Sequence, residues 1–181
     1  MKGAVDSMHF IEKFVTIIDG VSDKIGHIVG WLTTSMVLIV FYDTVMRYAF
    51  NKGNVALQEL EWHLFAVVFL IGAAYTLKEG GHVRVDILFI NFSKKTKAWV
   101  DLFGTLVFLI PFSIMIIYAT QKFIGNSWAV REVSPDPGGL PMRYILKAMI
   151  PAGFFLLIIQ GLSEAGKCLL VIFGYEKKEE N

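Results

Sequence analysis

The chain has 181 residues, of which 55% are hydrophobic and 18% charged, and its formal net charge is +1. Soluble proteins carry about 25% charged residues, so this composition excludes an ordinary soluble domain. The near-neutral charge argues against nucleic acid as a partner. The single cysteine, Cys168, excludes an intrachain disulfide and a cysteine-cluster metal site. Apolar runs of roughly 16–20 residues instead predict a membrane protein.

The first 24 residues predict an amphipathic helix that lies on the membrane surface. Apolar residues recur at helical spacing from Phe10 to Val21, with polar residues between them. We do not expect a signal peptide here, because acidic residues such as Asp6 and Glu12 interrupt every candidate apolar core. The alternative is a soluble helix that docks on the rest of the protein.

Residues 25–175 predict an all-α membrane domain with four transmembrane helices, accompanied by short interfacial amphipathic helices. The expected spans are about 25–47, 57–78, 99–121 and 144–164. The charged tail, residues 176–181, is expected to be disordered and cytoplasmic.

Local features are predicted within these spans. Asp43 and Arg47 lie four residues apart and can pair on one helix face, and Glu164 and Lys167, three apart, can pair at the membrane surface. Pro111 predicts a kink in the third span.

The polar stretch Lys78–Asp86 separates the second and third spans. Gly80 and Gly81 supply the backbone freedom for a chain reversal. We expect this stretch at a membrane surface, because hydrocarbon could not satisfy its backbone groups. The apolar residues Val83, Val85 and Ile87–Ile90 indicate a short interfacial segment before the chain re-enters the membrane. An ordinary solvated turn is the alternative.

The distribution of lysine and arginine predicts the orientation. Eleven of the 17 lie in the N-terminal segment, the central turn and the C-terminal end, and six lie on the opposite side. Both termini and the central turn are therefore expected in the cytoplasm. The longest outer connection, residues 125–141, contains three prolines and should be stiff. Its role as a docking surface or as a membrane-bound plug stays open.

The four histidines do not predict a haem site. His27 and His63 lie near span ends on opposite sides of the membrane, whereas axial ligands should face each other at similar depth. His9 and His82 lie outside the spans. No catalytic triad, zinc spacing or phosphate loop is present in the sequence, so we expect neither an enzyme nor a cofactor.

The spans carry no charged residue at their middle, and we expect no polar interior positions in them. An independent ion or proton pathway would need such residues. The chain is therefore predicted to be one subunit of a larger membrane complex.

Five stretches of the sequence, taken together and in order, match a known pattern. They are Arg47–Asn51, Ala56–Phe65, Gly72–Lys78, His82–Asp86 and Ser134–Pro141. Through them the chain resembles the small membrane subunit of tripartite ATP-independent periplasmic (TRAP) transporters, the DctQ-like family. The last stretch, with Lys147 and Pro151, most resembles the mannitol/chloroaromatic branch.

This resemblance implies a multi-pass protein of the bacterial inner membrane, with a large membrane subunit, a periplasmic substrate-binding protein and membrane lipids as partners. In this family the large subunit holds the substrate and sodium sites and moves as an elevator, while the small subunit broadens the static scaffold. The resemblance implies sodium-driven import of organic anions: carboxylates, sugar acids or sulfonates. A haem-binding redox subunit, or another structural subunit of a membrane complex, is the alternative.

No residue is expected to be catalytic or to bind substrate or metal. The candidates for subunit contacts are Arg47, Glu59, Glu61, Trp62, His63, His82, Arg84, Asp86, Arg143 and Lys147. Arg84 and Asp86 should organise the central turn and not contact substrate. Arg143 and Lys147 lie at the N-terminal end of the fourth span, where the helix dipole is already positive. We expect anions beside them, either Glu132 and Asp136 or groups outside the chain.

Overall fold

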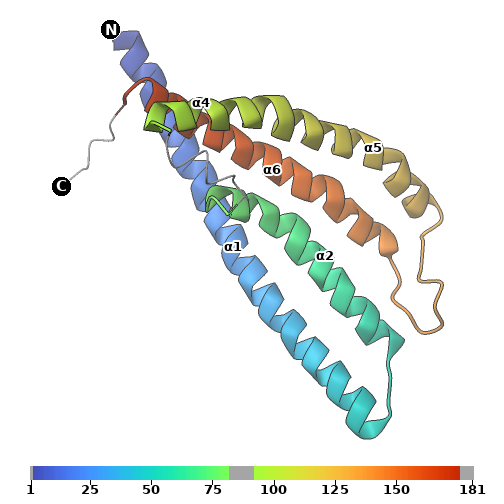
Figure 1. Cartoon of the computed structure of the whole chain (residues 1–181). Helices are drawn as coiled ribbons and strands as arrows, with labels where there is room; N and C mark the ends of the chain where they lie inside the picture. The colour runs from blue at the N-terminus through green and yellow to red at the C-terminus, as the bar shows by residue number, and fades with distance from the viewer. Residues whose placement is uncertain (1, 82–91, 176–181) are drawn as a thin grey trace.

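The computed structural model describes residues 2–81 and 92–175, and within these ranges every regular element is a helix. Four helical rods are long and apolar enough to cross a membrane, which confirms the all-α fold class. The elements are α1 (Lys2–Phe50), α2 (Val55–Lys78), α4 (Lys94–Gly104), the π-helical turn η1 (Thr105–Leu109), α5 (Ile110–Ala129) and α6 (Arg143–Ile172). The α4, η1 and α5 segments follow one another directly and form one curved rod (Figure 1).

Polar side chains cap the starts of α2 and α4, and a glycine follows the end of α2. The Asn54 side chain caps α2 by accepting a hydrogen bond from the Ala56 N–H at 2.9 Å. Ser93 caps α4 in the same way, with the Thr96 N–H as donor at 3.2 Å. After α2 the chain turns through Gly80, whose φ of 67° lies in the left-handed region that glycine tolerates. The turn at this glycine agrees with the predicted reversal, which continues into residues outside the described ranges.

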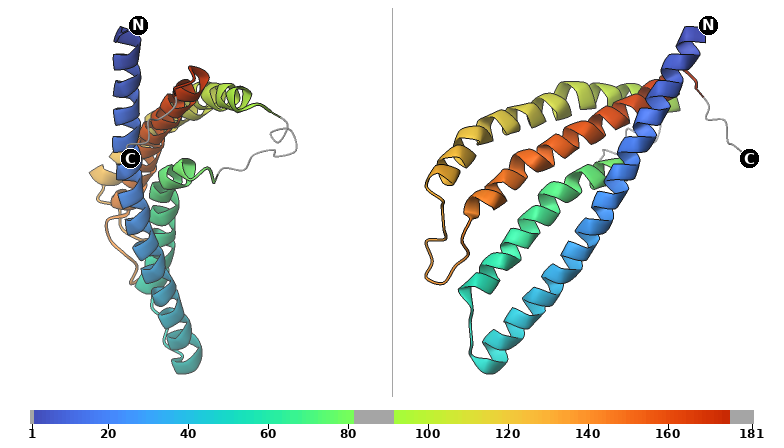
Figure 2. Two further views of the ribbon diagram at one scale, coloured as in Figure 1. Left: turned by 90° about the vertical axis from the view of Figure 1, so that its left-hand side faces the viewer. Right: turned by 180° about the vertical axis from the view of Figure 1, so that it is seen from behind.

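Helix α1 is a single rod of 49 residues. At 1.5 Å per residue it is roughly 73 Å long, more than twice the ~30 Å hydrocarbon core of a bilayer. Its N-terminal part extends past the neighbouring helices (Figure 2). The predicted amphipathic segment therefore continues into the first span without a break in the helix. Its position on a membrane surface stays a prediction.

The rods lie side by side in the order α1, α2, α6, α5 (Figure 1). Helix α2 packs between α1 and α6, and α6 packs between α2 and α5. Toward the chain termini α6 also contacts α1 and α4. The last helix in sequence is thus the one that joins the rest together.

A layer one helix thick buries little apolar surface. The buried apolar residues in the described part of the chain are small or few: Ala74, Ala98, Leu102 and Ala165. Large side chains such as Trp31, Phe41 and Tyr118 are exposed instead. These apolar faces need lipid or another membrane protein to cover them.

Glycines allow the helices of the layer to approach closely. A Cβ added at Gly153 of α6 would lie 2.5 Å from the carbonyl oxygen of Leu70 in α2. A Cβ at Gly26 of α1 would lie 2.5 Å from the Tyr75 ring. Helix contacts in membranes commonly depend on such small residues, because the hydrophobic effect does not drive them.

Pro111 predicts a kink in the third span, and the structure has an irregular turn just before this proline. The π-helical turn Thr105–Leu109 ends just before Pro111, which stands in the first turn of α5. Proline has no N–H to donate and crowds the preceding turn, so a regular α-helix cannot continue through it. The rod curves over this region (Figure 1).

Candidate functional site

Glu59 is the centre of a polar cluster at one end of the layer. We call this the loop end, because it holds the α1–α2 turn (residues 51–54) and the α5–α6 connection (residues 130–142). Glu59 lies near the start of α2 and is only 4% exposed. Its carboxylate accepts hydrogen bonds from the Ser134 hydroxyl and, at 2.5 Å, from the Leu140 N–H. Glu59 therefore ties α2 to the α5–α6 connection.

The α5–α6 connection is a compact turn around this carboxylate. The Ser134 N–H donates to the Leu140 carbonyl at 3.1 Å, and the Gly139 N–H donates to the Asp136 carbonyl at 3.0 Å. A Cβ at Gly139 would lie 2.8 Å from Glu59 Oε2, so only glycine fits there. These bonds agree with a stiff loop, while its role as docking surface or plug stays untested.

The two cations at the start of α6 have anions from the chain itself. The Lys147 ammonium pairs with Glu132, which confirms one of the two expected internal partners. Arg143 faces Glu59, with 3.7 Å between Nη2 and Oε1. The expectation for Asp136 is wrong, because Glu59 reaches this corner from α2 whereas the Asp136 N–H joins the loop turn by donating to Ser134 Oγ.

Glu132 lies in the connection, outside the helices. The hydrogen bond from the Lys147 ammonium holds the pKa of Glu132 below its ordinary value of 4.5. The carboxylate is therefore ionised at neutral pH and keeps its partner.

The predicted pair of Asp43 and Arg47 is confirmed near the end of α1. Arg47 Nη2 lies 3.1 Å from Asp43 Oδ2, and its guanidinium lies 5.5 Å from the centre of the Tyr48 ring. Asp43 is fully buried, and its oxygens lack a well-aligned hydrogen bond from the described residues. This ion pair neutralises a charge inside the layer.

The other α2 candidates surround Glu59. His63 Nδ1 lies 2.6 Å from the Glu59 carbonyl oxygen, and the Trp62 and His63 rings lie 4.0 Å apart. Oε1 of Glu61 is buried without a hydrogen-bond partner among the described residues. Sequence reasoning grouped these residues correctly around the start of α2. A role in subunit contact is untested for each of them.

The remaining candidates, His82, Arg84 and Asp86, lie outside the described residues. The predictions of an interfacial segment there, and of a turn organised by Arg84 and Asp86, therefore stay predictions.

A second polar cluster, which we call the anchor network, joins α1 to α6 at the opposite end of the layer. Gln160 is fully buried and accepts a hydrogen bond from the Ser22 hydroxyl at 2.6 Å. Its amide donates to Asp19 at 3.1 Å, and the Ser163 hydroxyl donates to the same carboxylate at 2.9 Å. The expectation that the spans lack polar interior positions is wrong at Gln160, because a partner on α1 satisfies its polar atoms.

Ion pairs extend the anchor network. Lys167 lies 2.8 Å from Asp19 and 2.7 Å from Glu164, so the predicted pair with Glu164 is confirmed. Lys78, at the end of α2, pairs with Asp23 of α1. The polar residues on one side of the amphipathic N-terminal pattern, Asp19 and Asp23, were the signal for these contacts. The sequence alone does not say which helices they meet.

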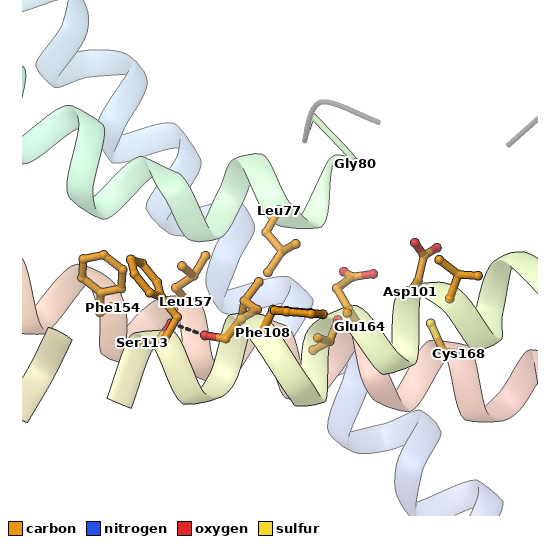
Figure 3. A pocket seen from close by; sticks show the side chains of 14 residues that line it. Leu77, Gly80, Asp101, Phe108, Ser113, Phe154, Leu157, Glu164 and Cys168 are labelled. Atoms are coloured by element: carbon orange, nitrogen blue, oxygen red, sulfur yellow. Dashed lines mark hydrogen bonds between the residues drawn. The ribbon is translucent and has the colours of Figure 1, made fainter. Parts of the chain in front are cut away.

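A hollow of about 660 Å³ lies between the end of α2, the α4–η1–α5 rod and α6 (Figure 3). Apolar side chains such as Leu77, Phe108 and Leu157 line most of it. Its polar residues are engaged within the chain: Ser113 donates to the Leu109 carbonyl at 2.7 Å, and Glu164 pairs with Lys167. The hollow thus offers mainly apolar contact surface.

The geometry defines a class of protein: a multi-helix membrane protein in which polar groups join helices to one another and the outer faces are apolar. Comparison with known families agrees. Residues 36–170 match the family model described as the DctQ component of tripartite ATP-independent periplasmic transporters. The chain belongs to this family of small TRAP permease subunits.

Two relatives are similar over most of the chain. The C4-dicarboxylate TRAP transporter small permease protein of Vibrio cholerae is 24% identical, over 84% of this chain and 76% of the relative. A putative TRAP transporter small permease protein of Haemophilus influenzae is 25% identical, over 67% and 73%. No solved structure matches the chain significantly. The family resemblance seen in the motifs is confirmed, and the mannitol/chloroaromatic branch stays a prediction.

Proposed function

We propose that the chain is the static scaffold subunit of a sodium-driven importer of organic anions. It pairs with a large membrane subunit that carries the substrate and sodium sites, and the complex receives substrate from a periplasmic binding protein. The observation that carries this proposal is the layer of helices only one helix thick, with apolar side chains exposed on it. Lipid or another membrane protein has to cover these faces, and a large membrane subunit is the partner that we propose for part of them.

The polar groups favour a supporting role over a transporting one. Glu59 and Gln160 are buried, and each connects two segments of the chain to each other. A substrate site would instead need polar groups that converge on a cavity. Joined in this way, the helices form a fixed frame against which a larger subunit can move.

The proposed orientation places both termini in the cytoplasm, from the excess of lysine and arginine on that side. The loop end then faces the periplasm, on the side of the binding protein. Carboxylates are one substrate class consistent with the family, and the Vibrio cholerae relative is named for C4-dicarboxylates.

Affinity purification of the tagged chain from its native membrane tests the pairing. We expect a large polytopic membrane protein to co-purify, together with no visible absorption from a cofactor. A Soret band stoichiometric with the chain would overturn the proposal in favour of a redox subunit. Purification of the chain without any membrane partner would also contradict it.

Transport assays in liposomes test the sodium dependence of uptake and the need for the other subunits. We expect uptake of a radiolabelled organic anion only when both membrane subunits, the binding protein and an inward sodium gradient are present. Equal uptake by this chain alone would contradict a scaffold role. Uptake that ignores the sodium gradient would contradict the proposed driving force.

A further inference from the structure

A second hollow, of about 480 Å³, lies at the loop end between α2, α5 and α6, and we call it the loop-end groove. Aromatic and aliphatic side chains line it, among them Phe65 and Phe69 of α2 and Ile150 of α6. Arg143 and Lys147 line its α6 side. The groove therefore combines an apolar wall with two cations.

The dimensions of the groove match one leaflet of a bilayer. Its lining residues run from Arg143 to Ile150 on α6 and from Trp62 to Leu70 on α2. At 1.5 Å per residue these stretches are roughly 10 to 12 Å long. Half of a ~30 Å hydrocarbon core is about 15 Å. A groove of this length, starting near the loop end, fits within a single leaflet.

Arg143 keeps unused hydrogen-bonding capacity beside this groove. Its Nε is buried and has no hydrogen-bond acceptor among the described residues. Its Nη2 lies 3.7 Å from Glu59, which is too long for a hydrogen bond. The Glu59 carboxylate already accepts from Ser134 and Leu140. Besides Glu59, the guanidinium has the Trp62 ring at 5.4 Å, so it keeps donors that an acceptor from outside the described chain can use.

The start of α6 adds to this demand for an acceptor. Met142, which precedes the helix, provides no side-chain cap for its first N–H groups. Lys147 differs from Arg143, because Glu132 already holds its ammonium and the Phe123 ring lies 4.1 Å away. Of the two cations that line the groove, Arg143 is therefore the one with an unmet donor.

We propose that the loop-end groove binds one membrane phospholipid, with an acyl chain along the groove and the phosphate at the Arg143 guanidinium. A phospholipid offers both chemistries at this depth, an apolar chain below and phosphate oxygens at the interface. Guanidinium binds phosphate oxygens in a forked geometry, and Trp62 is the residue type that favours the interface. The charges of Arg143 and Lys147 are balanced by those of Glu59 and Glu132. The direction of the guanidinium N–H groups, and not a net positive charge, therefore selects the phosphate. This site goes beyond the scaffold function.

Native mass spectrometry of the purified complex, titrated with dioleoyl phosphatidylglycerol, tests the proposal. We expect one tightly retained phospholipid per chain in the wild type, and weaker binding of dioleoylglycerol, which has no phosphate. Arg143→Gln should weaken phosphatidylglycerol binding by on the order of tenfold, the usual effect of losing a charged hydrogen bond. The matched control is Arg131→Gln, an exposed arginine in the same connection and outside the groove. It should bind like the wild type.

Further variants separate the two halves of the site. Ala66→Trp places a large ring in the groove without changing any charge, and it should also reduce lipid binding. Arg143→Lys keeps the charge but loses the fork, so intermediate binding is expected, even if Arg143→Gln fails to assemble. Inorganic phosphate at millimolar concentration should not displace the lipid. Displacement by phosphate, or wild-type binding by Ala66→Trp, would overturn the acyl-chain half of the proposal.

The groove could instead be covered by the large subunit, and crosslinking decides this. A photo-crosslinking amino acid in place of Phe69, activated in native membranes, should attach phospholipid. Crosslinking to the large subunit in place of lipid would overturn the proposal. So would equal phosphatidylglycerol binding by Arg143→Gln and the wild type.

Discussion

Glu59 shows how one buried carboxylate can hold a loop that is distant in sequence. It meets Ser134, which is 75 residues away, and the Leu140 N–H, which is 81 residues away. Both oxygens of the carboxylate are used, so a polar side chain that would be costly at this depth becomes a fixed point of the fold. The residues that pack against this carboxylate, such as Gly139, therefore have little room for a larger side chain.

Gly139→Ala should destabilise the loop end. The added Cβ would lie 2.8 Å from Glu59 Oε2, and the loop would have to shift away from the carboxylate. Overpacking of this kind costs about 1–3 kcal/mol. Thermal unfolding of the purified complex measures it. The control Gly53→Ala lies in the other turn of the loop end, where an added Cβ meets nothing, and should unfold like the wild type.

Charge reversal at Lys147 should be rescued by a matching reversal at Glu132. Lys147→Glu places two carboxylates in contact, which should lower the recovery of assembled complex. Glu132→Lys in the same chain restores an opposite pair. Asp136→Lys should not rescue, because Asp136 joins the loop turn through its backbone. Rescue by Asp136→Lys alone would refute this assignment, and so would normal assembly of the single reversal.

The same ion pair predicts a loss of stability at low pH. The pKa of Glu132 is lower in the folded protein than its ordinary value of 4.5, chiefly through Lys147, so the folded state favours the ionised form. Its contribution is fully present above pH 4.5 and is lost as the pH falls through the lower folded-state pKa. Melting temperatures between pH 6 and pH 3, compared with those of Glu132→Gln, measure this. Identical pH profiles for the two proteins would contradict the coupling.

At the scale of the elements, α6 is the helix on which the others depend. It contacts α1, α2, α4 and α5, and it carries both Gly153 at the α2 crossing and Gln160 at the α1 crossing. The close approach at Gly153 fixes the crossing with α2, and the buried hydrogen bond of Gln160 fixes the crossing with α1. Damage to α6 should therefore loosen the whole layer.

Gly153→Ala should reverse the usual effect of alanine in a helix. Alanine is favoured over glycine by about 1 kcal/mol in a helix interior, but here its Cβ would lie 2.5 Å from the Leu70 carbonyl oxygen. We expect a lower melting temperature for the complex. Gly104→Ala is the matched control, because nothing lies within 4 Å of its Cβ, and it should be neutral or stabilising. Equal melting temperatures for the two variants would show that the α2–α6 crossing is not tight.

The sequence predicts local pairs better than distant ones. Asp43 with Arg47 and Glu164 with Lys167 follow from helical spacing alone, because residues three or four apart share one face of a helix. Gln160 with Ser22 depends on the register of two helices, 138 residues apart, which no local pattern contains. The partner of Arg143 was missed for the same reason, since Glu59 arrives from another helix.

At the scale of the whole molecule, the apolar faces could be predicted but their arrangement could not. Runs of apolar residues identify four spans because the bilayer sets their length. Those runs do not say that α6 inserts beside α2, leaving a layer one helix thick. That arrangement depends on a few glycines and hydrogen bonds between helices, and a hydropathy pattern does not contain this information.

Transport kinetics of the reconstituted complex test the scaffold role most directly. The measurement is initial uptake against concentration for an organic anion that the wild-type complex accumulates, in liposomes with wild-type chain or with Gly153→Ala. A scaffold that touches no substrate should lower the maximal rate, in proportion to the complex lost, while the apparent KM stays within about twofold, because no binding interaction is removed. A KM raised tenfold or more in fully assembled Gly153→Ala complex would contradict the account, because it would show that the helix layer shapes the substrate site.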